Sequence, residues 1–167
     1  MQPNLRADRF AILKATAKCH QCRADTLVSA LMVPAYKEFD EEWMESDDSA
    51  LLIYVEAVDM STQQAWSERA QWIRPVSSKT AGMTYWANVC ACGALQGDFY
   101  LIKPNAPFFP LDDDGIAAIE IEWIESPIKA VAATSRSSWT DRLIEQCPHR
   151  GWTPPSPPKK RRIRGRI

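Results

Sequence analysis

Histidines, phosphate-binding glycine loops and long apolar runs are scarce or missing in this 167-residue chain. Its two histidines, His20 and His149, belong to no H-E-x-x-H signature, so the sequence does not favour histidine-based acid–base catalysis. Its six glycines form no phosphate-binding loop. No segment reaches the roughly 18 apolar residues of a membrane span, and residues 1–10 are too polar for a signal peptide. We therefore expect a non-enzymatic protein of the reducing cytoplasm, without membrane contact.

Charge is distributed unevenly, although the whole chain carries a formal net charge of only −1. Residues 153–167 hold six basic side chains and no acidic one, behind a Pro-Pro-Ser-Pro-Pro spacer. Residues 1–152 are left with 14 basic and 21 acidic side chains. Because 46% of the residues are hydrophobic, a packed core is expected. The sequence thus predicts an acidic globular domain over 1–152 and a disordered basic tail over 153–167.

Strand patterns outnumber helix patterns along the predicted domain. The clearest alternation is in IAAIEIEWIE, where Ile119, Ile121 and Trp123 face the core and the intervening glutamates face solvent. Short apolar runs predict the other strands. The predicted strands are 10–18, 26–33, 50–58, 83–89, 116–125 and 128–133. Together with the predicted helices, these strands lead us to expect an α+β fold built on a mostly antiparallel sheet.

Two helices are predicted, over 61–73 and 138–147. Ser61 and Gln64 have capping-box spacing at the start of the first, and Pro75 follows its end. Residues 38–48 contain seven acids in eleven positions, interrupted by aromatic residues, and this composition predicts a loop or frayed helix.

Four of the five cysteines form two short pairs, Cys19 with Cys22 and Cys90 with Cys92. Zinc prefers soft thiolates in a closed tetrahedron, and two cysteines on one turn form a chelating clip. Gly93 suits the second clip because it lets backbone N–H groups turn toward the sulfurs. Two other interpretations remain open: buried unligated thiols, or a redox pair at the first clip. The spacing favours one structural zinc ion held by all four.

The two clips and their flanking strands resemble the zinc-ribbon class, in which two cysteine knuckles on separate β-hairpins share one metal. The C-x-C spacing of Cys90 and Cys92 departs from that pattern, because its clip is one residue shorter than the usual C-x-x-C. The resemblance implies a zinc-ribbon-like domain with an insertion over 23–89. The fifth cysteine, Cys147, is predicted to be a core-facing helix residue, and His149 is predicted to lie at the surface.

Function is predicted from charge more than from the cysteines. The basic tail can bind the phosphate backbone of nucleic acid, and we expect nucleic acid as the partner. The same tail would also serve as a nuclear-import address in a eukaryotic cell, or only as a solubilising segment. The alternative function is a protein-interaction module, such as an inhibitor, immunity factor or effector, that docks through the acidic segment with Phe39 and Trp43. The tail residues expected to contact nucleic acid are Lys159, Lys160, Arg161, Arg162, Arg164 and Arg166.

Overall fold

The computed structural model describes residues 1–146, which form eleven strands and four helices. The predicted basic tail, Cys147 and His149 lie outside the described residues. The strands are β1 (Leu5–Ala7), β2 (Phe10–Lys18), β3 (Asp25–Val33), β4 (Tyr36–Asp40), β5 (Glu42–Ser46), β6 (Ala50–Val58), β7 (Ile73–Ser78), β8 (Met83–Val89), β9 (Leu95–Gln96), β10 (Glu120–Ile124) and β11 (Ile128–Ser135). The helices are α1 (Met60–Arg69), α2 (Asp98–Ile102), α3 (Asp113–Ala117) and α4 (Ser138–Gln146).

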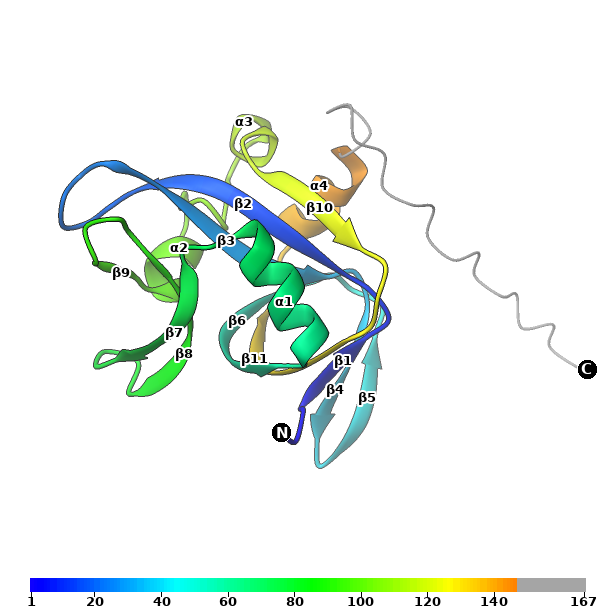
Figure 1. The fold of residues 1–167 in the computed structure, drawn as a ribbon. Helices are drawn as coiled ribbons and strands as arrows, with labels where there is room; N and C mark the ends of the chain where they lie inside the picture. Colours follow the sequence, from blue (N-terminus) through cyan, green and yellow to red (C-terminus); the bar gives the residue numbers. More distant parts are fainter. Residues whose placement is uncertain (147–167) are drawn as a thin grey trace, which may run out of the picture.

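An eight-stranded antiparallel sheet, in the order β10-β2-β3-β6-β11-β1-β4-β5, dominates the fold (Figure 1). One of its faces packs under α1, where Trp66 is almost fully buried, and the other packs under α4, where Leu143 is. Because β2 and β3 are buried on both faces, they are nearly continuous apolar runs instead of alternating ones. The predicted α+β class with a mostly antiparallel sheet is therefore confirmed.

A second, three-stranded antiparallel sheet in the order β7-β8-β9 lies beside the large one (Figure 1). β8 packs against β6 and β3 of the large sheet. Pro75 lies within β7, which pairs only with β8, and an edge strand tolerates a residue without a backbone N–H. The small sheet carries one half of the cysteine cluster on its β8–β9 hairpin.

The first predicted helix is shorter than expected and begins differently. Asp59, not Ser61, is the N-cap residue, because its carboxylate accepts a hydrogen bond of 3.0 Å from the Thr62 backbone N–H. The helix ends at Arg69, and Ile73 begins β7 by pairing with Asn88. Tertiary strand pairing therefore overrides the helical spacing that predicted residues 61–73 as one helix.

The acidic segment was wrongly predicted as a loop or frayed helix, because it forms the β4–β5 hairpin. Glu41 has a φ of 64° at the turn. The cross-strand partners are complementary: Phe39 packs on Trp43 with ring centroids 5.5 Å apart, and Lys37 pairs with Glu45 at 2.8 Å. Such pairs stabilise a hairpin even where the acid content argues against it.

The prediction of two helices was also too low. α2 and α3 are five-residue helices in segments where short apolar stretches and turn residues give no helical period. Both pack onto the face of the large sheet that α4 covers, through Leu101 and Ile116. Within the described residues, no helix is long and apolar enough to cross a membrane.

Candidate metal centre

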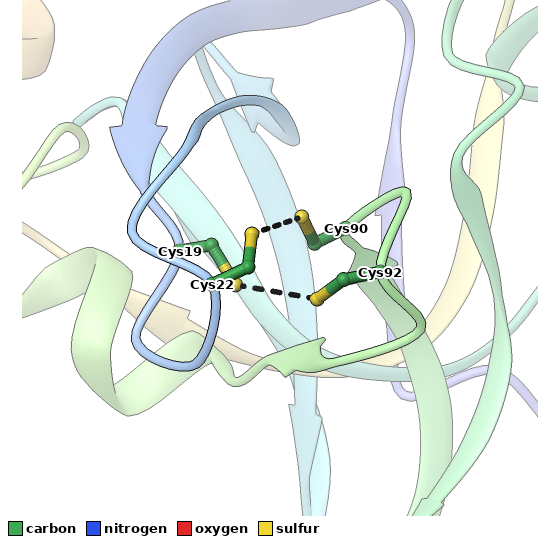
Figure 2. Close-up of side chains that lie close together, drawn as sticks. All are labelled: Cys19, Cys22, Cys90 and Cys92. Atoms are coloured by element: carbon green, nitrogen blue, oxygen red, sulfur yellow. Dashed lines mark hydrogen bonds between the residues drawn. The ribbon is translucent and has the colours of Figure 1, made fainter.

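The four paired cysteines come together at the junction of the two sheets (Figure 2). Cys19 follows β2 and Cys22 lies in the turn to β3, so the first clip belongs to a hairpin of the large sheet. Cys90 follows β8 and Cys92 precedes β9, so the second clip belongs to a hairpin of the small sheet. Each clip is therefore a turn between antiparallel strands, and the centre joins two separate hairpins.

The sulfur geometry matches what a tetrahedral metal ion requires. All four Sγ atoms lie within 4.8 Å of one another. The Cys19–Cys92 and Cys22–Cys90 sulfurs are each 3.7 Å apart, and both contacts run between clips. Four sulfurs placed about 2.3 Å from one tetrahedral ion are about 3.8 Å apart, whereas disulfide sulfurs are separated by about 2.05 Å. The arrangement can hold a metal ion and is too open for disulfide bonds.

The backbone of each clip folds into a tight turn that aims both sulfurs the same way. The Arg23 N–H donates to the Cys19 carbonyl at 3.0 Å, and the Gly93 N–H donates to the Cys90 carbonyl at 2.8 Å. Arg23 (φ 65°) and Gly93 (φ 91°) both have left-handed backbone, which glycine adopts easily and arginine at some cost. Arg23 and Gly93 therefore both close the turn of their clip, although only Gly93 was predicted to do so.

The shorter C-x-C clip closes one residue earlier than the first. Cys19 donates its N–H to the Ala24 carbonyl, whereas Cys90 donates to Ala94, both at 2.9 Å. Removal of one residue from the turn thus shortens the loop without moving the sulfurs out of range. The departure from the usual spacing is compatible with a common site.

Hydrogen bonds from neighbouring groups favour the thiolate at Cys19. Its sulfur accepts from the Gln21 backbone N–H and from the Gln96 side-chain amide, each at 3.4 Å. The backbone N–H of Cys22 contributes most, and together with that of Gln21 it outweighs burial and lowers the pKa of Cys19 to about 6. The Cys92 backbone N–H likewise lowers the pKa of Cys90. Both buried cysteines are thus prepared to act as anionic ligands.

Cys92 titrates in the opposite direction. The Ala94 backbone N–H lowers the pKa of Cys92. Desolvation and hydrogen bonds with the three neighbouring thiols have a larger, opposite effect, so the pKa is raised to about 11. Four sulfurs this close do not all ionise unless a cation offsets their negative charge. The thiol cluster therefore has the electrostatics of a cation site.

A buried polar network lies next to the second clip and ties the two sheets together. The Asn88 carboxamide oxygen accepts from the Ser29 backbone N–H (2.7 Å) and from the Trp72 indole (2.9 Å). Its amide nitrogen donates to the Ser29 carbonyl at 3.0 Å. The Trp66 indole in turn donates to the Ser29 hydroxyl at 2.9 Å. Neither Asn88 nor the hydrogen bond from Gln96 to Cys19 was foreseen, because no spacing rule singles out a lone amide side chain.

Another chemically distinctive group is the carboxyl of Asp98. Burial raises its pKa to about 6, although the Tyr54 backbone N–H donates to it at 2.7 Å. The cavity beside it measures only about 10 Å³, which is no larger than one water molecule. Asp98 therefore anchors α2 to β6 and has no room for a substrate.

The six basic residues of the predicted nucleic-acid site, Lys159 to Arg166, lie outside the described residues. Of the two predicted sites, the structure thus describes the four cysteines and places them together. No protein-family model, curated protein or solved structure matches the chain.

Proposed function

We propose that the protein is a non-enzymatic zinc-binding protein whose metal ion links the β2–β3 and β8–β9 hairpins. The convergence of four cysteine sulfurs at tetrahedral spacing carries this proposal. Four thiolates complete the zinc coordination and leave no position for a water or substrate, so the site is structural. The pairing of two cysteine turns on separate hairpins also supports the zinc-ribbon resemblance, with residues 23–89 as the insertion between the clips. Free thiolates of this kind are maintained in reducing compartments.

The purified protein is expected to contain about one zinc ion per chain, as measured by elemental analysis. The loaded protein should be colourless, because the filled d shell of zinc gives no visible absorption, whereas iron in a four-cysteine site would be coloured. Fully folded protein with no bound metal would contradict the proposal. A stoichiometric iron content would retain the metal site and reject zinc.

Nucleic acid is the partner that the charge distribution supports best. Six basic side chains follow the Pro-Pro-Ser-Pro-Pro segment, and each one that contacts a phosphate releases counterions. We expect a fluorescein-labelled oligothymidine of about twelve nucleotides to bind in a salt-dependent manner. Replacement of all six residues by glutamine in the full-length chain should reduce the magnitude of the negative slope of log affinity against log salt by about 4. An absence of binding at low salt would contradict this function.

A second candidate function, docking of a protein partner, is favoured by the surface of the β4–β5 hairpin. β5 is an edge strand of the eight-stranded sheet. Phe39, Trp43 and Met44 are 46%, 38% and 49% exposed on this acidic hairpin. Edge strands with exposed aromatic side chains suit strand addition by a partner, and the acids favour a cationic one. This function would survive the glutamine substitutions in the tail, so the oligothymidine titration separates the two candidates.

A further inference from the structure

A groove of about 560 Å³ lies beside the metal centre, in the size range of ligand sites. Its walls come from the end of β2, the first cysteine turn and the segment that runs from β9 to α3. Three basic residues line it, Lys18, Arg23 and Lys103, and none of its lining residues is acidic. Residues 1–146 hold 21 acidic and 13 basic side chains, so this groove is a cationic patch on an acidic body.

The cations are exposed and available to a ligand. Arg23 and Lys103 lie at the surface. Lys18 pairs with Asp25 at 2.6 Å, but both side chains are about two-thirds exposed, and such a pair is weak and exchanges readily with another anion. The groove therefore presents separate positive charges to an anion that extends along it.

Exposed aromatic rings stand next to these charges. Tyr100 on α2 is 55% exposed and lies nearly parallel to the His20 ring, with an interplanar angle of 20° and centroids 6.3 Å apart. Phe99, 61% exposed, meets Tyr100 edge to face, and the Lys103 ammonium lies 5.4 Å from the Tyr100 centroid. Adjacent exposed rings form an apolar surface that a ligand can cover. Their faces offer stacking surface for a planar group.

The aromatic wall is held firmly despite its exposure. α2 is fixed by Leu101, which is buried in the core under α4, and by the hydrogen bond from the Tyr54 N–H to Asp98. The opposite wall depends on the metal centre, since His20 and Arg23 belong to the first cysteine turn. Gln96 lines the groove and also donates to the Cys19 sulfur. A metal ion that fixes the cysteine turn therefore also fixes half of the groove.

We propose that this groove binds single-stranded nucleic acid, with phosphates against Lys18, Arg23 and Lys103 and a base stacked on Tyr100. This inference rests on the proposed nucleic-acid function and assigns it a second contact besides the tail. Alternating charge and aromatic faces are what single-strand sites use, because unpaired bases expose their faces and duplex bases do not. A ligand that offered only phosphate would leave the aromatic wall uncovered.

The test is a fluorescence-anisotropy titration of the labelled oligothymidine with the full-length, zinc-loaded protein. Tyr100→Ala is expected to weaken binding by about 5- to 150-fold, the range of losing one base–aromatic stack. Tyr100→Phe keeps the ring and should bind like the wild type. Trp43→Ala, an exposed aromatic on the β4–β5 hairpin, is the matched control and should also be unaffected.

Arg23→Gly tests the charge separately from the fold. Glycine accepts the left-handed backbone at this position, so the cysteine turn and the zinc content should be retained. The loss of one phosphate contact should lower the salt slope by about 0.7. Zinc content and unfolding temperature of every variant serve as checks on folding.

Three results would overturn the inference in distinguishable ways. If Tyr100→Ala binds like the wild type while glutamines in the tail abolish binding, the nucleic-acid function stands and the groove has no part in it. If duplex DNA of the same length competes as well as the single strand, the stacking assignment is wrong. If the wild type binds no oligothymidine at low salt, the proposed nucleic-acid function fails together with the groove.

Discussion

Cys19→Ser is expected to release the metal ion and to lower the free energy of unfolding by at least about 3 kcal/mol, because the binding free energy of a structural zinc ion is folding free energy. Of the four clustered cysteines, Cys19 has the surroundings that favour its thiolate most strongly. It is buried, and its sulfur accepts hydrogen bonds from Gln21 and Gln96. The measurement is a urea unfolding midpoint, taken with zinc per chain from elemental analysis.

Chelation identifies the metal as the origin of that loss. A strong chelator should lower the wild-type midpoint toward that of Cys19→Ser and leave the variant unchanged. Cys147→Ser is the matched control, since Cys147 belongs to neither short cysteine pair of the sequence, and it should retain zinc. Equal midpoints for the wild type with chelator, the wild type without it and Cys19→Ser would show that the cluster holds no structural metal.

The cysteine cluster could be predicted from sequence because its chemistry is local. Two thiols on one turn form half a site wherever the turn lies, and two such halves need only meet. The sequence could not tell that the halves belong to different sheets. That arrangement depends on the packing of β8 against β6 and β3, which involves residues far apart in the chain.

The sequence did not predict β7, the β4–β5 hairpin or α2, because each depends on contacts or lengths that a local pattern does not show. Residues 61–73 have helical spacing throughout, yet Ile73 gains more from pairing in β7 than from another helical turn. The acidic hairpin depends on side chains that meet across two strands, such as Phe39 and Trp43, and a one-strand pattern cannot show this. The wall of the groove at Tyr100 belongs to a helix too short to produce a period.

The Asn88 side chain makes several buried hydrogen bonds that no sequence pattern indicates. β6 pairs with β3 only at residues 31–33, so the Ser29 N–H and C=O lie beyond that pairing. The Asn88 carboxamide bonds both of them, in place of a neighbouring strand, and accepts from the Trp72 indole as well. Asn88 and Ser29 are 1% and 3% exposed, so water cannot replace the lost bonds.

Asn88→Ala is therefore expected to lower the free energy of unfolding by about 3–5 kcal/mol, since each buried polar group left without a partner costs about 1–3 kcal/mol and such costs do not add fully. Gln64→Ala is the matched control, because Gln64 is also an amide with a side-chain hydrogen bond, to Glu68, but is exposed. It should change stability by less than about 0.5 kcal/mol.

Urea unfolding of zinc-loaded protein measures both variants, and Asn88→Asp refines the result. Aspartate keeps an acceptor for the Ser29 and Trp72 N–H groups but, when ionised, has no donor for the Ser29 carbonyl. Because a protonated carboxyl can donate, the stability that Asn88→Asp loses relative to the wild type at the same pH should become smaller as the pH is lowered. If Asn88→Ala unfolds at the same urea concentration as Gln64→Ala, the network does not hold the sheets together. The two cysteine hairpins would then be joined only by the metal ion and apolar packing. In that case a chelator should lower the urea midpoint of Asn88→Ala and of the wild type by the same amount.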